Sequence, residues 1–382
     1  MIDTDRAAVL RQQSLQTTGS FGTLETAGRS QSTADEESDA DFSKESDDGT
    51  ADDRATSVSV REDVTYTVRE AGEMKLDLYV PEGSATDGDP PLVVYVHGGG
   101  WVFETRKNAP DLKRYAAEWG CAMASVSYRL APVPDDTELP ADRIAANPTP
   151  RGVFPAQIVD VKAAIRWLRA NADEFGFDPD RVATWGASAG GHLAALAGTL
   201  DDIETLPGDA YPDDAVTKVV APDRSGAVQA VIDWYGISNL LELPGRPSGL
   251  ESVLLGGDVS KNQDKARRAS PTTYAGPETP PCLFMHGRDD QVVPIDQSQL
   301  LFEALQASGV GATMYELHEL GHVFGAESER TAMAQLTAAS RPAQTVTATA
   351  CLEAGASADG LLESVPPAGP DAIERFLDRT LA

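Results

Sequence analysis

The sequence predicts an α/β fold, with an open, mostly parallel sheet of about eight strands and helices on both faces. Three observations lead to this prediction. Several short runs are almost entirely apolar, as in strands that are covered on both faces. Segments with helical spacing of apolar residues separate these runs, and an alternating pair of strands precedes them. Strands and helices that alternate in this way are typical of a parallel sheet.

Two half-buried strands are expected first. The alternating sequences VTYTVR and KLDLYV are joined by a turn that contains Gly72, which predicts an antiparallel hairpin. The apolar runs LVVYVH at 92–97 and CAMASVSY at 121–128 are expected to be parallel strands. Between Ala156 and Phe175 apolar residues recur at helical spacing, and the strand RVATW follows.

The same alternation continues toward the last residues. The expected elements are, in order, the strand AVQAVIDWY at 227–235, the strand CLFMH at 282–286, a helix through Leu300, Leu301 and Leu305, the strand ATMYEL, and a closing helix with Ile373, Phe376 and Leu377. Residues 240–280 are expected to carry a cap segment, and 326–369 form an insertion before the last helix. Within the insertion, 327–338 is expected to be helical, either as a lid or as surface decoration.

Residues 1–57 differ in composition from the rest of the chain. They are rich in Ser, Thr, Asp, Glu and Gly, and the part from Ser32 to Asp53 has no aromatic residue except Phe42. Such a segment cannot bury enough apolar surface to fold alone, so we expect a disordered acidic tail. Residues 58–382 are expected to form the folded domain.

The chain is strongly acidic, with a formal net charge of −29 and a pI near 4.4. The tail does not explain this charge, because residues 1–58 hold 13 acidic and 5 basic residues and leave 47 acidic and 26 basic residues for the body. A body without a basic stripe is not expected to bind nucleic acid. Strong self-repulsion is relieved by salt, so we expect a salt-adapted source.

The remaining composition argues against membranes, disulfides and metals. The first residues have no apolar stretch behind a basic start, and no apolar run of about 18 residues occurs. A soluble, cytoplasmic protein is therefore expected. Cys121, Cys282 and Cys351 lie far apart, so we expect buried thiols and no metal cluster.

A G-x-S-x-G motif stands at one strand-to-helix junction and reads Gly186-Ala187-Ser188-Ala189-Gly190, with Gly191 next. It comes immediately after the strand RVATW and immediately before the helix-forming sequence GHLAALAG. A sharp turn there would hold a serine in a strained, exposed conformation, and the flanking residues must be small to clear it. Ser188 is therefore the candidate nucleophile.

A glycine-rich motif follows the strand LVVYVH and reads His97-Gly98-Gly99-Gly100-Trp101. It resembles the oxyanion-hole motif of esterases and lipases, in which the backbone comes close to a substrate carbonyl. The amides of Gly99 and Gly100, together with that of Ala189, are expected to stabilise a developing oxyanion. His97 is expected to orient the loop.

Two further loops at strand ends supply a candidate acid and a candidate base. The sequence HGRDDQVVP presents Asp290, with Asp289 as a rival one position earlier, while His286 is interpreted as structural. The sequence LGHVF presents His322, which is the last of the five histidines, and His318 is its competitor. The order Ser, Asp, His matches the succession expected for a strand-end catalytic triad.

Together these motifs resemble the carboxylesterase and feruloyl-esterase-like branch of the α/β-hydrolases, from about residue 60 to 325 plus the final helix. YRLAP at 128–132 is also similar to hormone-sensitive-lipase-like esterases. The resemblance implies the α/β-hydrolase fold and an active site of Ser188, Asp290 and His322. The loop ELGHVF and the insertion at 326–369 depart from the family pattern, which leaves the substrate open.

The expected reaction is hydrolysis of a small-molecule carboxylic ester through an acyl-enzyme, with Ser188 as nucleophile, His322 as base and Asp290 as its partner. No metal or organic cofactor is implied. An arylformamidase-like or peptidase-like amide hydrolase would use the same triad, and a binding protein that retains the fold without activity is a remote alternative. The sequence leaves homo-oligomerisation open.

Overall fold

The computed structural model describes residues 57–83, 88–134, 139–201, 203, 220–243, 249–339, 346–351 and 368–382. Residues Arg54–Ala382 form one compact unit, and only this unit is described below. The predicted acidic tail therefore lies outside the described residues, apart from Ser57. Most of the insertion between 340 and 367 also lies outside them.

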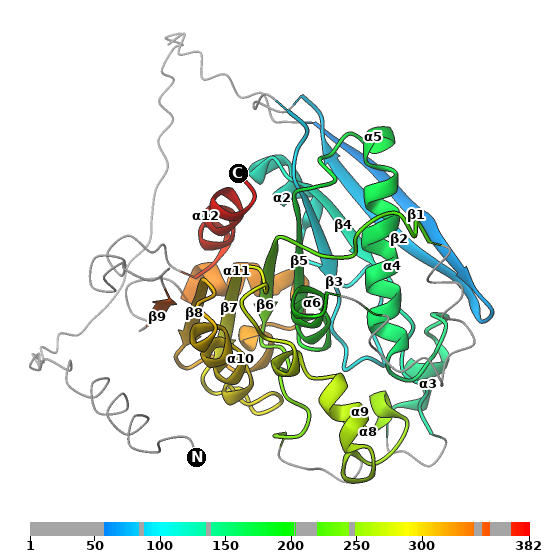
Figure 1. Cartoon of the computed structure of the whole chain (residues 1–382), viewed down its shortest axis with the longest axis vertical. Coiled ribbons are helices and arrows are strands. Elements are labelled where there is room, and N and C mark those ends of the chain that lie inside the picture. The colour runs from blue at the N-terminus through cyan, green and yellow to red at the C-terminus, as the bar shows by residue number, and fades with distance from the viewer. Residues whose placement is uncertain are drawn as a thin grey trace, which may run out of the picture. The chain divides into compact units, whose positions relative to one another are not determined.

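Within the described residues, one sheet of nine strands runs in the order β1-β2-β4-β3-β5-β6-β7-β8-β9 (Figure 1). The strands are β1 (Val58–Arg69), β2 (Gly72–Pro81), β3 (Leu92–Val96), β4 (Ala122–Val126), β5 (Val182–Ala187), β6 (Ala230–Trp234), β7 (Cys282–Gly287), β8 (Ala312–Leu317) and β9 (Val346–Cys351). The six strands from β3 to β8 are parallel to one another. This confirms the mostly parallel sheet.

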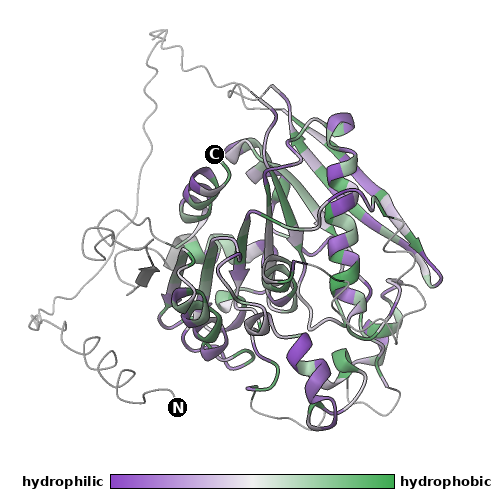
Figure 2. Cartoon of the chain, in the orientation of Figure 1, coloured by the Kyte–Doolittle hydropathy of each residue, from purple (hydrophilic) through white to green (hydrophobic). Residues whose placement is uncertain are grey.

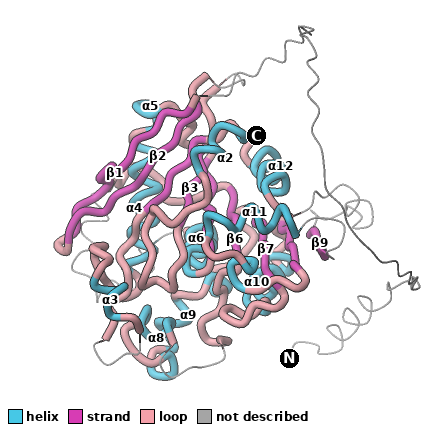
Figure 3. Tube along the Cα trace, turned by 180° about the vertical axis from the view of Figure 1, so that it is seen from behind, coloured by secondary structure: helices cyan, strands magenta, loops and turns pink. Residues whose placement is uncertain are grey.

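Both edges of the sheet are antiparallel. The predicted hairpin is present as β1 and β2, with Arg69 opposite Gly72, and β2 pairs antiparallel with β4. Figure 3 shows this hairpin at one edge of the sheet. At the other edge β9, which the insertion supplies, pairs antiparallel with β8. No strand was predicted in this part of the insertion, so the ninth strand adds to the eight expected ones.

The helices alternate with the strands as expected. They are α2 (Leu112–Trp119), α3 (Ala141–Ala145), α4 (Ala156–Ala170), α5 (Ala172–Phe175), α6 (Ala189–Thr199), α8 (Leu250–Leu255), α9 (Gln263–Arg268), α10 (Asp296–Ala307), α11 (Glu329–Ala339) and α12 (Pro370–Thr380), with short 3-10 turns η3 (Val259–Lys261), η4 (Pro271–Thr273) and η5 (His322–Gly325). Of these, α2 was not predicted, because its short amphipathic pattern lies between two stronger strand signals.

Helices cover both faces of the sheet, and the two-residue period of the strands divides the core accordingly. In β3 the side chains of Leu92, Val94 and Val96 join the cluster beneath α4, α6 and α10. Val93 and Tyr95 point the other way, into the cluster beneath α2, α11 and α12. Figure 2 shows the hydrophobic residues concentrated along the central strands.

Candidate active site

Ser188 sits at the sharp turn between β5 and α6. Its backbone adopts φ 55° and ψ −117°, a region that residues with a Cβ rarely occupy. The amide of Ser188 donates to Trp234 O at 2.8 Å, which ties the turn to β6. A Cβ at Gly186 would overlap the Gly190 carbonyl, and one at Gly190 would overlap that of Val96. The small residues of the motif are thus required by packing, as predicted.

The structure brings Ser188, His322 and Asp290 together in one hydrogen-bonded chain, which we call the Ser–His–Asp chain. Ser188 Oγ lies 3.1 Å from His322 Nε2, and His322 Nδ1 lies 2.7 Å from Asp290 Oδ2. A carboxylate accepts a hydrogen bond, so Nδ1 carries the proton and Nε2 is free to accept from the serine hydroxyl. The three groups come from the carboxyl ends of β5, β7 and β8.

Asp290 is held firmly as an anion. Its Oδ1 accepts the amides of Val292 and Val293, each at 2.8 Å, and His286 Nε2 lies 3.4 Å from its Oδ2. Burial acts to raise the pKa of Asp290, but the hydrogen bonds from His286, His322 and Val293 outweigh it and place the pKa well below its usual range. The side chain of Asp290 is therefore a carboxylate at neutral pH.

The rival residues lie elsewhere. Asp289 is exposed, whereas Asp290 is 5% exposed and faces His322. His318 Nε2 lies 3.3 Å from a nitrogen of Arg288 at the surface. His286 is buried, with Nδ1 2.7 Å from Ser298 Oγ and Nε2 2.9 Å from Val293 O. Its placement agrees with the structural interpretation, in which it supports the Asp290 loop.

Aromatic residues that the motifs did not identify hold His322 in place. The ring of Tyr235 lies 4.8 Å from the His322 ring, tilted at 60°. Phe324 is fully buried and packs edge-on against Tyr235 and Trp234. Phe324 has a positive φ of 55°, as does Val323 at 54°, so η5 is strained. The only sequence signal for this support was the aromatic pair that ends β6.

The glycine loop, residues 97–101, follows β3 and faces the nucleophile turn. Gly99 and Gly100 have positive φ values of 82° and 58°. No hydrogen bond to any described residue is found for the amides of Gly99, Gly100 or Ala189. Three backbone amides without internal partners could donate hydrogen bonds to an oxyanion that forms at Ser188.

The flanks of the glycine loop are anchored. The His97 ring stacks on Tyr128 at 4.4 Å, and burial lowers its pKa to about 3, so it stays neutral. The Tyr128 hydroxyl lies 3.0 Å from His97 O. Trp101 Nε1–H donates to His192 Nδ1 at 3.1 Å. The predicted orienting role of His97 therefore has a structural basis in this stack.

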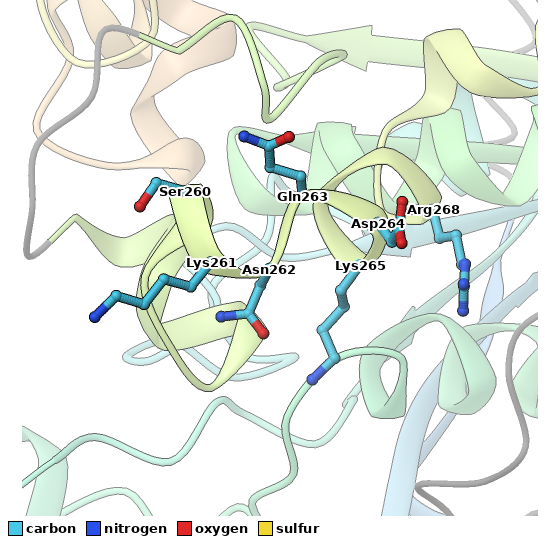
Figure 4. Close-up of a pocket in the computed structure, with 7 residues that line it drawn as sticks. All are labelled: Ser260, Lys261, Asn262, Gln263, Asp264, Lys265 and Arg268. Carbon is cyan, nitrogen blue, oxygen red and sulfur yellow. The ribbon is translucent and has the colours of Figure 1, made fainter.

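The predicted cap segment reaches the glycine loop through Leu250, the first residue of α8. A Cβ on Gly100 would overlap Leu250 Cδ1, so this side chain lies directly against the candidate oxyanion amides. A pocket of about 500 Å³ lies farther along the same segment, at η3 and α9. Figure 4 shows the cationic groups of Lys261, Lys265 and Arg268 pointing in different directions. They do not converge on one ligand, and this pocket contains no residue of the Ser–His–Asp chain.

The cysteines and the composition of the helices can be followed in the described residues. Cys121 and Cys282 are buried free thiols, and burial raises the pKa of Cys121 to about 12. Among the described residues, no three His, Cys, Asp or Glu side chains are grouped to hold a metal ion. None of the described helices is both long and apolar enough to span a bilayer.

Comparison with known proteins places this site in a family. The family model described as BD-FAE matches residues 76–305, which run from the middle of β2 to near the end of α10. The chain belongs to the BD-FAE family. The match spans the glycine loop, Ser188 and Asp290, whereas His322, η5 and α11 lie beyond its end. The BD-FAE match agrees with the feruloyl-esterase-like resemblance.

Curated relatives and solved structures agree with this assignment. Esterase LipQ of Mycobacterium tuberculosis is 31% identical over 259 residues, which are 66% of this chain and 54% of that protein. Esterase LipC of the same organism is 33% identical over 61% of this chain and 53% of its own length. This chain spans about half the length of these curated relatives.

Among solved structures, a truncated carbohydrate esterase from gut microbiota has a TM-score of 0.58 and 26% identity, over 76% of this chain and 99% of that one. Thermogutta terrifontis esterase 2, at 23% identity and a TM-score of 0.52, shares the fold over 75% of this chain and 92% of its own. The predicted α/β-hydrolase fold is confirmed by these neighbours and by the sheet order.

Proposed function

We propose that the protein is a carboxylesterase-type serine hydrolase that cleaves a small-molecule ester through an acyl-enzyme on Ser188. The observation that carries this proposal is the Ser–His–Asp chain, with 3.1 Å between Ser188 Oγ and His322 Nε2 and 2.7 Å between His322 Nδ1 and Asp290 Oδ2. Relatives named as esterases support an ester as the substrate. The family and the fold alone would not decide the chemistry.

In the proposed mechanism, His322 Nε2 takes the proton from Ser188 Oγ while the oxygen attacks the ester carbonyl carbon. The amides of Gly99, Gly100 and Ala189 bind the oxyanion that forms. The tetrahedral intermediate collapses, the bond to the alcohol oxygen breaks, and His322 gives its proton to that oxygen. Water then repeats the sequence on the acyl-enzyme and releases the acid. Asp290 stabilises the imidazolium throughout.

The experiment that tests this function is a hydrolysis panel of p-nitrophenyl esters from acetate to long acyl chains, with purified protein in molar KCl. Turnover of short-chain esters that is lost in Ser188→Ala supports the proposal. An amide panel is run beside it, because an arylformamide or a peptide would be attacked by the same groups. Turnover of amides with none of esters would replace the proposal by amide hydrolysis, and turnover of neither would remove it.

The acyl preference is expected to depend on Leu250, because this side chain lies against Gly100, where the substrate carbonyl would bind. Leu250→Ala removes three carbons and opens space beside the acyl group. We expect the ratio of kcat/KM for octanoate over acetate to rise about tenfold. Leu241→Ala is the matched control, because Leu241 belongs to the same segment and is 38% exposed. An unchanged ratio in Leu250→Ala would place the acyl pocket elsewhere.

Salt dependence is a separate expectation from the charge of the body. The 47 acidic and 26 basic residues after residue 58 repel one another at low ionic strength. Added salt screens this repulsion, so the melting temperature is expected to rise by several degrees between about 0.1 M and 2 M KCl. Sucrose at matched osmolality is the control for non-ionic stabilisation. A melting temperature that is independent of KCl would remove the inference of salt adaptation.

A further inference from the structure

A buried pair of acidic side chains lies behind the glycine loop and has no part in the proposed mechanism. Glu329 is the first residue of α11, in the insertion, and is 6% exposed. Glu104 follows the glycine loop along the chain and is partly buried. Both carboxyl groups lie beside Gly98, because a Cβ built there would meet Glu329 Oε1 and Glu104 Oε2. A buried carboxyl group is costly unless it is hydrogen-bonded, so the groups that Glu329 and Glu104 contact are fixed relative to them.

Glu329 makes two hydrogen bonds to the strand and loop that precede the candidate oxyanion amides. Gly98 N–H donates to Glu329 Oε1 at 3.0 Å, and the Tyr95 hydroxyl donates to Glu329 Oε2 at 2.6 Å. A Cβ on Gly98 would overlap Glu329 Oε1, so the carboxyl group lies directly against the loop backbone. Helix α11 is therefore joined to the loop one residue before Gly99.

Glu104 packs against the same loop. A Cβ on Gly99 would overlap the backbone and side chain of Glu104, and Glu104 Oε2 is buried with no hydrogen-bond partner among the described residues. Both carboxyl groups thus lie against the backbone of the loop. Any change in the separation of these groups would shift the amides of Gly99 and Gly100.

The surroundings favour one shared proton over two negative charges. Burial first, and then the charge of Glu104, raises the pKa of Glu329 well above its usual range, and burial also raises that of Glu104. The groups that face the pair are Tyr95 from β3, Tyr128 after β4, Tyr235 after β6, His322 after β8 and Arg143 of α3. The only full cation among them, Arg143, acts on Glu104.

We infer that Glu329 is a positioning residue, which shares one proton with Glu104 and holds Gly98 so that the amides of Gly99 and Gly100 point at the substrate carbonyl. This inference rests on the proposed function. In this inference helix α11 of the insertion positions the glycine loop, a role that differs from both expected alternatives, a lid and a surface helix. The shared proton is expected to reside mainly on Glu329, which is the more deeply buried group.

The pair also gives the reaction an alkaline limit. Both pKa values are raised, so the pair keeps a proton to a higher pH than an ordinary glutamate and loses it as the pH rises through the raised value. Two adjacent negative charges then repel each other beside Gly98 and displace the loop. Activity is expected to fall on the alkaline side for this reason.

The test compares Glu329→Ala and Glu329→Gln with the exposed neighbour variant Glu327→Ala as matched control. Alanine removes the acceptor for Gly98 N–H, so kcat for p-nitrophenyl acetate is expected to fall about 10- to 100-fold with KM within about threefold. Glutamine reproduces the protonated acid: its oxygen accepts from Gly98 and its amide donates. It is expected to keep kcat within about threefold and to lose the alkaline fall.

Three outcomes would overturn the inference. Glu329→Ala could match Glu327→Ala in kcat, Glu329→Gln could lose as much activity as Glu329→Ala, or the alkaline fall could persist in Glu329→Gln. If Glu329→Ala fails to fold, the pH profile of Glu329→Gln compared with that of wild type still tests the inference. Melting temperatures show whether a loss of activity results only from a loss of stability.

A second readout does not need a substrate, so the inference can fail separately from the proposed function. Hydrogen exchange followed by mass spectrometry on peptides that cover residues 97–103 is expected to be faster in Glu329→Ala than in wild type, and unchanged in Glu329→Gln. Equal exchange in all three proteins would contradict the inference even if the protein is an esterase. If residues 97–103 exchange faster only in Glu329→Ala but the wild-type protein hydrolyses no ester, the proposed function is wrong and the contact between Glu329 and the glycine loop is still supported.

Discussion

Ser188→Ala is expected to lower kcat/KM for p-nitrophenyl acetate by at least about a thousandfold, to the level set by binding and the oxyanion amides alone. The physical reason is that Ser188 Oγ is the hydroxyl placed 3.1 Å from an imidazole nitrogen that is free to accept its proton. Alanine keeps the Cβ and the strained backbone of the turn, so the fold should be retained.

Two controls separate this loss from misfolding. Ser308→Ala changes a serine at the end of α10, whose hydroxyl donates to Ala304 O, and should leave activity unchanged. The circular dichroism spectrum and melting temperature of Ser188→Ala should match those of wild type. Residual activity within about tenfold of wild type would show that Ser188 is not the nucleophile.

Asp290→Asn is expected to lower kcat by about a thousand- to ten-thousandfold. The carboxylate accepts His322 Nδ1–H at 2.7 Å and stabilises the imidazolium that forms during attack. An asparagine amide can instead donate to Nδ1, which places the imidazole proton on Nε2, where it cannot accept from Ser188. The change also removes a charge that His286 and two backbone amides stabilise, so some loss of melting temperature is expected.

Asp289→Asn provides the matched control, because Asp289 is the adjacent residue in the same loop and its side chain is exposed. It is expected to keep kcat within about twofold. The two variants have the same charge change, so overall electrostatics cannot explain a difference between them. A large loss in Asp289→Asn with little loss in Asp290→Asn would assign the acid to the other position.

Much of the fold could be predicted from local pattern. The parallel strands are short apolar runs such as LVVYV, because helices cover both faces, and the hairpin alternates because one face is half exposed. The short helix α2 was missed because it has only eight residues and only Leu112, Tyr115, Ala116 and Trp119 face the core, although Asp111 caps it by accepting the amide of Arg114. Strand β9 was missed because the insertion reads as an Ala- and Thr-rich stretch.

Residues of the candidate site could be predicted where the reactive side chain stands beside a glycine or follows a predicted strand. Ser188, Asp290 and His322 were all found in this way, and their separations in the sequence explain why only the fold could bring them together. Tyr235 and Glu329 could not be found. A tyrosine at the end of a strand and a glutamate at the start of a helix are ordinary, and their importance depends on contacts across more than 80 residues of sequence.

Labelling with an alkyl fluorophosphonate shows whether Ser188 is the reacting nucleophile. The protein is incubated with the reagent, and its intact mass and its peptides are measured. We expect one adduct per chain, located on the peptide that contains Ser188, with none in Ser188→Ala and slowed formation in Asp290→Asn. An adduct on a different residue, or ester turnover by protein that the reagent leaves unmodified, would contradict the account.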